Sequence, residues 1–153
     1  MVHAALVAAG IRAARYTSPH LVRLNERFVV GNEMVDDEML ESVANHVLDA
    51  IDRPPTFFEA TTAMAFEIFR RSHVEVAVIE VGLGGRFDAT NVLEPPVGAI
   101  TSIALDHEQH LGRTLEQIAF ARSSTMVHGP SIFAASPRTT RCSSTTPSRT
   151  NIA

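Results

Sequence analysis

VEVAVIEVGLGGRFDATN, residues 74–91, joins an apolar run to a glycine-rich loop. The run has Val, Ile and Ala at neighbouring positions, which predicts a strand buried on both faces in a parallel, helix-covered sheet. Glu80 stands near the end of this run, and an unpaired charge is costly to bury. We therefore expect either an arginine partner or a metal ion beside Glu80.

Helical patterns flank the predicted strand. Apolar residues recur at three- and four-residue spacing in the segment that ends at Ile51. A second helix is predicted over residues 57–71, where Thr56 and Glu59 can form a capping box and the apolar residues lie on more than one face. Further helices are predicted over residues 1–9 and 111–120, and further strands over residues 11–16 and 97–105. Strands separated by helices predict an α/β fold with a mostly parallel sheet, in which ligands bind outside the carboxyl ends of the strands.

The composition indicates one globular domain or part of one. The chain has 153 residues, 45% of them hydrophobic, and no apolar stretch approaches the roughly 20 residues of a membrane-spanning helix. The first residues lack the basic start of a signal peptide, and Cys142 is the single cysteine, so we expect a cytoplasmic protein with no membrane partner. Before residue 122 there are 9 Arg against 17 Asp and Glu, which argues against nucleic acid as a partner.

The character of the sequence changes at Arg122. Of the 32 residues from Arg122 to Ala153, 20 are Ser, Thr, Pro or Arg, and none is acidic. Such a segment buries too little apolar surface to offset its ordering entropy, so we expect a globular part over residues 1–121 and a disordered tail over residues 122–153. The tail also has the composition that out-of-frame reading of a GC-rich gene tends to produce.

Three polar positions follow the ends of predicted strands. The loop Thr17–His20 follows one strand, Glu80 closes the next, and His107 comes after the last. A hydroxyl, a carboxylate and an imidazole at one rim of a sheet favour Mg²⁺ over zinc, which prefers more nitrogen and sulfur. A zinc site that uses His107 and His110 is the alternative, although the sequence has no HExxH motif. The glycine loop superficially resembles the GxGxxG motif of dinucleotide-binding proteins, but Phe87 stands where that motif has its third glycine. The sequence therefore does not predict a dinucleotide-binding site.

Four segments carry a resemblance to a known family. In chain order they are YTSPHLVRLNERF, PTFFEATTAMAFEIF, VIEVGLGGRFDATN and ITSIALDHEQHLGRTLEQIA. Together they resemble the folylpolyglutamate synthase and dihydrofolate synthase branch of the Mur ligase family, over residues 1–121. The resemblance implies a monomeric, ATP-dependent carboxylate–amine ligase of folate biosynthesis. In this reaction ATP phosphorylates the carboxylate of dihydropteroate or of a folate, and the amine of L-glutamate attacks the acyl phosphate.

The resemblance also implies roles for particular residues. The side chains that resemble the family's Mg²⁺ ligands are Ser18, Glu80 and His107, of which Glu80 and His107 are also the expected catalytic residues. Two stretches resemble those that hold the pterin-bearing substrate, and they are Thr56, Phe57, Phe58 and Glu59, and Phe87, Asp88 and Ala89. A phenylalanine of the first stretch could stack on the pterin, and Asp88 could accept hydrogen bonds from its ring.

Two features of the family are not found in this sequence. Family members carry a phosphate loop ending in GKS or GKT before the helix that here starts at Met1, and a lysine after the LEQIA helix, whereas this chain has no lysine. We therefore expect an incomplete ATP-binding domain, without the phosphate loop and the C-terminal domain, that is inactive alone. The alternatives are a non-catalytic pterin-binding or interaction module and a small metal-dependent hydrolase. The motifs do not separate dihydrofolate synthase from folylpolyglutamate synthase.

Overall fold

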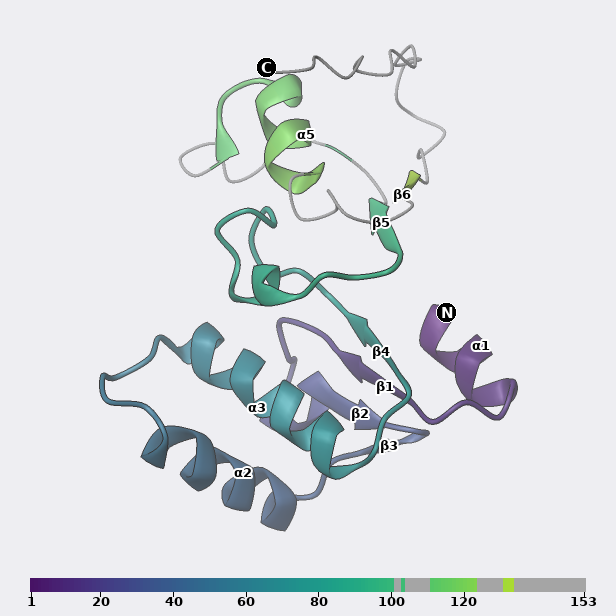
Figure 1. The fold of residues 1–153 in the computed structure, drawn as a ribbon, viewed down its shortest axis with the longest axis vertical. Coiled ribbons are helices and arrows are strands. Elements are labelled where there is room, and N and C mark those ends of the chain that lie inside the picture. The colour runs from purple at the N-terminus through teal and green to yellow at the C-terminus, as the bar shows by residue number, and fades with distance from the viewer. Residues whose placement is uncertain (101–102, 104–110, 124–130, 134–153) are drawn as a thin grey trace, which may run out of the picture.

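A mixed four-stranded sheet forms the centre of the fold (Figure 1). The computed structural model describes residues 1–100, 103, 111–123 and 131–133. In the order of the sheet, the strands are β3 (Glu33–Met34), β2 (Phe28–Val30), β1 (Ala13–Tyr16) and β4 (Val76–Ile79). Strands β1 and β4 are parallel, whereas β1–β2 and β2–β3 are antiparallel. The predicted α/β class is confirmed, with a sheet that is mixed.

The parallel pair arises where the sequence predicted it. The strand predicted over residues 11–16 is β1, and it connects to β4 through α2 (Asp37–Asp49) and α3 (Phe57–Arg71). A crossover with helices is what a parallel pair requires. The antiparallel pairs come from two short strands within residues 28–34, which follow a 3₁₀ turn, η1 (Leu24–Arg27).

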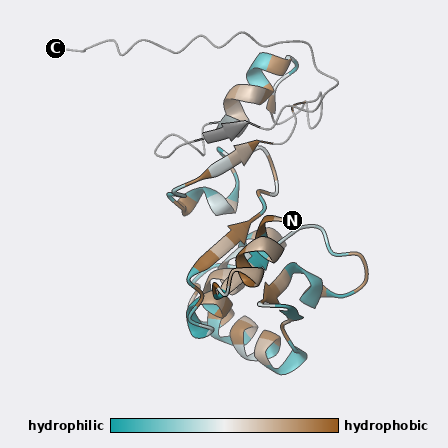
Figure 2. Ribbon diagram, turned by 90° about the vertical axis from the view of Figure 1, so that its right-hand side faces the viewer, coloured by the Kyte–Doolittle hydropathy of each residue, from teal (hydrophilic) through white to brown (hydrophobic). Residues whose placement is uncertain are grey.

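Helices α2 and α3 pack against each other and cover one face of the sheet (Figure 1). Asp36 caps α2 by accepting a hydrogen bond from the amide of Met39 at 2.8 Å. Figure 2 shows hydrophobic and hydrophilic residues alternating along these helices, as expected for helices with one buried face. The core between helices and sheet contains these buried side chains: Ala14, Tyr16, Phe28, Val43, Val47, Met64, Ala65, Ile68 and Phe69.

The other described elements are short. Helix α1 (Val2–Ala8) contacts β1 and β4, on the opposite side of the sheet from α2 and α3 (Figure 1). The glycine loop leads into a second 3₁₀ turn, η2 (Ala89–Val92). Beyond it lie β5 (Gly98–Ile100), α5 (Leu115–Ser123) and β6 (Ser131–Phe133). None of the described helices is long and apolar enough to cross a membrane.

The prediction that the strand beginning at Val74 is buried on both faces is wrong. In the described part of the chain, β4 is the edge strand of its sheet, and Val76 is 37% exposed. The next strand, β5, was predicted within residues 97–105, but it pairs with β6 in a separate parallel sheet. Because β5 does not pair with β4, the outer edge of β4 has no strand beside it among the described residues. Of the tail expected over residues 122–153, residues 122 and 123 belong to α5 and residues 131–133 form β6, while the rest lies outside the described residues.

Candidate functional site

The ends of β1 and β4 place two predicted site residues together. Because these strands are parallel, the loop after β1 and the loop after β4 leave the same rim of the sheet. The amide of Glu80 donates to the carbonyl of Tyr16 at 2.9 Å, which continues the strand pairing to the rim. There the amide of Ser18 donates to Oε2 of Glu80 at 2.7 Å. The loop and the carboxylate that the sequence predicted at one rim are therefore in direct contact.

Glu80 differs from its prediction in burial. The residue is exposed, and the group that meets its carboxylate is a backbone amide, not an arginine. The cost of burying a charge, from which the prediction of a partner started, therefore does not arise. Among the described residues, neither Oε1 of Glu80 nor the hydroxyl of Ser18 takes part in a hydrogen bond. A carboxylate oxygen and a hydroxyl are thus available on one rim, and oxygen ligands of this kind suit Mg²⁺.

The third predicted metal ligand, His107, lies outside the described residues, and so does His110, which the zinc alternative needs. Within the described ranges there is no group of three or more His, Cys, Asp or Glu side chains that could hold a metal ion.

Thr56 and Glu59 form the capping box that their spacing predicted. The amide of Glu59 donates to Oγ1 of Thr56 at 3.2 Å, and the amide of Thr56 donates to Oε2 of Glu59 at 2.7 Å. These bonds satisfy donors that the first turn of a helix otherwise leaves free. The hydrogen bond from the Thr56 amide, joined by one from the Thr56 hydroxyl, lowers the pKa of Glu59 below its usual value. Both side chains therefore fix the start of α3.

The two phenylalanines between them have different surroundings. Phe58 is half-buried against the core, with its ring centroid 6.2 Å from that of Tyr16. Phe57 is 58% exposed. Of the two rings that the sequence offered for stacking on a planar ligand, Phe57 is the one that presents a large open surface.

The second predicted stretch lies against the first through Gly82. A Cβ atom on Gly82 would come within 2.7 Å of Cε2 of Phe58 and 3.0 Å of Oδ2 of Asp88. Only glycine therefore allows the start of α3 and the glycine loop to approach this closely. Asp88 is buried and accepts hydrogen bonds from the amide of Leu83 at 2.6 Å and from the amide of Thr90 at 2.9 Å.

The neighbours of Asp88 are more open. Phe87 is 79% exposed, with Cζ of Arg86 5.5 Å from its ring centroid, and Ala89 is half-buried. The carboxylate of Asp88 thus holds the loop in shape while the adjacent ring faces solvent. The loop also contacts helix α5: the amide of Arg86 donates a hydrogen bond to the carbonyl of Ala121 at 3.3 Å.

His20 and Arg27 were not singled out from the sequence, yet they join this rim. Nε of Arg27 donates to Nδ1 of His20 at 2.9 Å, and the guanidinium lies over the ring of Phe57, 5.3 Å from its centroid. Arg27 is buried, and its Nη1 has no hydrogen-bond partner among the described residues. Both residues belong to the segment YTSPHLVRLNERF. That segment was the available signal, but it does not show that the chain turns back to bring them together.

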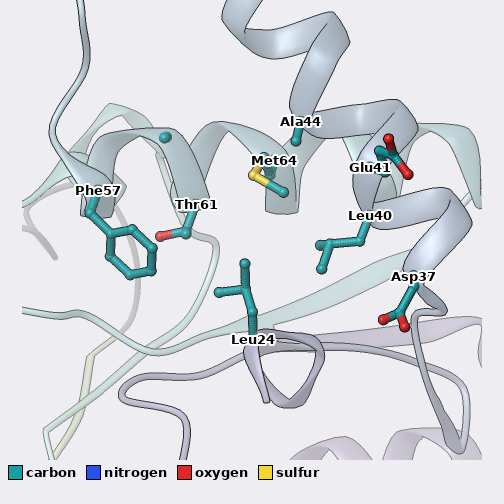
Figure 3. Close-up of a pocket in the computed structure, with 9 residues that line it drawn as sticks. Leu24, Asp37, Leu40, Glu41, Ala44, Phe57, Thr61 and Met64 are labelled. Carbon is teal, nitrogen blue, oxygen red and sulfur yellow. The ribbon is translucent and has the colours of Figure 1, made fainter.

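A hollow of about 450 Å³ opens beside Phe57, between η1, α2 and α3 (Figure 3). Leu24, Leu40 and Met64 give it an apolar floor, and Asp37 and Glu41 stand at one end. Of the predicted site residues that the structure describes, only Phe57 lines this hollow. Asp37 is engaged there by Asn25 and Arg23, and the hydrogen bond from Asn25 is the main reason that the pKa of Asp37 is lowered.

Curated relatives and solved structures agree on the same group of enzymes. No protein-family model matches the sequence. A probable dihydrofolate synthetase of Schizosaccharomyces pombe is 43% identical over 77% of this chain and 29% of its own length. The folylpolyglutamate synthase of Lacticaseibacillus casei is 39% identical over 81% of this chain and 31% of its own length.

The fold gives the same result. The structure of E. coli FolC in complex with ADP superposes with a TM-score of 0.84 at 35% identity, over 88% of this chain and 33% of that one. A bifunctional folylpolyglutamate synthase/dihydrofolate synthase with Mn, AMPPNP and L-glutamate bound gives a TM-score of 0.82 at 35% identity, over 90% of this chain and 34% of that one. The resemblance read from the sequence is confirmed, and the chain spans about a third of the length of these relatives.

Proposed function

We propose that this chain is part of an ATP-dependent carboxylate–amine ligase that joins L-glutamate to dihydropteroate or to a folyl-(poly)glutamate. The observation that carries the proposal is the contact between Ser18 and Glu80 at the shared rim of β1 and β4. Its support from outside the chain is the similarity to synthases of this kind, one of which has been solved with Mn, AMPPNP and L-glutamate bound. Dihydropteroate, folate, L-glutamate and ATP are accordingly the proposed small-molecule partners.

In this proposal Ser18 and Glu80, with His107, hold Mg²⁺. The metal would neutralise charge on the phosphates of ATP while the substrate carboxylate is converted to an acyl phosphate. The bond between the Ser18 amide and Oε2 of Glu80 fixes the carboxylate and leaves Oε1 and the Ser18 hydroxyl for the ion. The protein's contribution is then chiefly to position the reacting groups.

The proposed substrate surface lies between the start of α3 and the glycine loop. Phe57 and Phe87 offer exposed rings for a planar pterin. Thr56 and Glu59 fix the helix start that presents Phe57, and Asp88 fixes the loop that presents Phe87 and Ala89. Direct acceptance of a pterin hydrogen bond by Asp88 would use a lone pair that the Leu83 amide and the amide and hydroxyl of Thr90 leave free.

We further propose that the 153-residue chain by itself does not catalyse the ligation of L-glutamate. They contain no lysine, and they match about a third of the length of the relatives. The test is a chimera in which residues 1–121 replace the matching segment of a related synthase. We expect ATP-dependent ligation of L-glutamate to dihydropteroate by the chimera, and none by the 153-residue chain. Turnover by the isolated chain would contradict this part of the proposal.

The metal site has its own test in the isolated chain. Mn²⁺ binding, followed by electron paramagnetic resonance, should weaken about tenfold or more in Glu80→Gln, because the amide cannot replace a charged ligand. The matched control is Glu94→Gln, which removes an exposed carboxylate elsewhere. Equal Mn²⁺ affinity in Glu80→Gln and Glu94→Gln would contradict the assignment of Glu80, whatever the chimera does.

A further inference from the structure

We infer that Arg27 and His20 form a carboxylate-binding subsite whose wall is the exposed ring of Phe57. The inference rests on the proposed function, since it assigns a part of the substrate to residues of the same rim. It adds two residues that the family resemblance did not place in the site, and it defines what they bind.

Arg27 is a buried cation with unused hydrogen-bonding capacity. Arg27 is 6% exposed. Its Nε donates to Nδ1 of His20, and its Nη1 is buried without a partner among the described residues. Among the described residues, no carboxylate lies within ion-pair distance of the Arg27 guanidinium. Burying a guanidinium donor unpaired is costly, and buried polar groups are normally satisfied. An oxyanion supplied by a ligand would satisfy Nη1 and compensate the charge.

His20 supplies a second donor. Because Nδ1 accepts from Arg27, the proton of a neutral imidazole is assigned to Nε2. The ring is half-buried, and Nε2 has no partner among the described residues. A guanidinium N–H of Arg27 and an imidazole N–H of His20 thus both lack a partner among the described residues, on two side chains that contact each other. A carboxylate oxygen is a suitable acceptor for either donor, and its hydrogen bond with the charged guanidinium is the stronger of the two.

Phe57 forms one wall of the subsite. Its ring centroid is 5.3 Å from Cζ of Arg27 and 6.5 Å from the centroid of the His20 ring. Phe57 is the first residue of α3, and its ring is largely exposed. The guanidinium of Arg27 lies over one face of the ring, and much of the remaining surface meets solvent. The exposed part of the ring offers an apolar surface to a ligand whose carboxylate reaches the guanidinium.

The subsite lies on the same rim as the proposed metal site. The amide of Thr17 donates to the carbonyl of Arg27 at 3.1 Å, and Ser18 is the next residue. Two ligands of the proposed reaction carry a carboxylate, namely the aromatic acid and L-glutamate. The chemistry of the subsite is common to both, and experiment must distinguish them.

The experiment compares carboxylate and amide ligands on the 153-residue chain by isothermal titration calorimetry. One pair of probes is pteroate and pteroate carboxamide, and the other is L-glutamate and L-glutamine. In the unmodified chain we expect one pair to show about a ten- to hundredfold preference for the carboxylate, as a charge-assisted hydrogen bond provides. The pair that shows it identifies the source. In Arg27→Gln the preference should fall to near one.

Two further variants keep the test decisive. Arg113→Gln removes an exposed guanidinium far along the chain and should leave the preference unchanged. His20→Ala should lower it severalfold, and this variant decides the matter if circular dichroism shows that Arg27→Gln does not fold. If Arg27 only braces the loop through His20, Arg27→Gln weakens both members of a pair equally.

The outcomes separate this inference from the proposed function. Binding of pteroate and its carboxamide without any preference, or a preference that survives in Arg27→Gln and His20→Ala, overturns the subsite and leaves the proposed function standing. Failure of the unmodified chain to bind either pteroate or its carboxamide counts against the proposed pterin surface as well.

Discussion

Gly82 controls how closely the two halves of the proposed substrate surface approach. Replacement by alanine would place Cβ against the ring of Phe58 and 3.0 Å from Oδ2 of Asp88. The Phe58 ring packs on Tyr16 and the core, so it cannot move away freely. We expect Gly82→Ala to lower the free energy of unfolding by about 1 to 3 kcal/mol, as in other overpacked sites. Urea unfolding followed by circular dichroism measures it.

The control for Gly82→Ala is the same change in a Phe58→Leu background. Leucine removes the ring edge that the new methyl group would meet, so the cost of Gly82→Ala should shrink there. An equal cost in both backgrounds would show that the ring contact is not its cause.

At the scale of single residues, local interactions could be predicted from the sequence and distant ones could not. The capping box of Thr56 and Glu59 needs only a spacing of three residues, and it is present. The exposure of Glu80 was not predictable, because it depends on which strand lies beside β4. The contact of His20 with Arg27 depends on β2 returning antiparallel to β1. No pattern in the sequence encodes that turn directly.

Glu67 ties α3 together and connects it to α2. Its carboxylate accepts hydrogen bonds from Arg70 and Arg71, and Nη1 of Arg71 donates to Oγ of Ser42 on α2 at 3.0 Å. The hydrogen bond from Arg70, followed by that from Arg71, lowers the pKa of Glu67 from 4.5 to about 2. A carboxylate whose pKa is lower in the folded state stabilises the fold only while it is ionised.

The stabilisation from Glu67 should therefore depend on pH in a defined direction. It is fully present above about pH 4.5 and is lost as the pH falls toward 2. We expect the difference in unfolding free energy between the unmodified chain and Glu67→Gln to be constant near neutral pH and to shrink over this interval. Urea titrations at a series of pH values measure it.

A matched control for Glu67 is available on α2. Glu38 is exposed and forms no ion pair among the described residues, so the difference caused by Glu38→Gln should be smaller. A difference for Glu67→Gln that does not change between pH 4.5 and 2 would contradict the role given to the two arginines.

Among the elements, length and periodicity decided what could be predicted. Helix α3 runs from Phe57 to Arg71, as the capping box and the long apolar run predicted. Strands β2 and β3 have three and two residues, too few for an alternating pattern to show. The pairing of β5 with β6 joins segments about thirty residues apart, and such distant pairing leaves no periodic signal in either segment.

At the scale of the whole molecule, the confirmed parts are the α/β class and the relation to the synthases, and each rests on several independent segments. Ser18, Glu80 and Phe58 come from different segments of the chain, and all lie around the ends of β1 and β4. Their common location follows from topology, because the ends of parallel strands share one rim. The roles proposed for them depend on His107 and on ligands, and they remain predictions.

The exposed edge of β4 should make the isolated chain self-associate. Among the described residues no strand pairs with the outer edge of β4, where Val76 is 37% exposed, and an apolar unpaired edge is a template for pairing between molecules. Val76→Lys places a charge on this edge and should reduce light scattering on concentration. Val92→Lys adds the same charge at a 75% exposed valine of η2, away from the sheet, and should not. Equal effects of the two changes would attribute the association to net charge, since only Val76→Lys alters the edge itself.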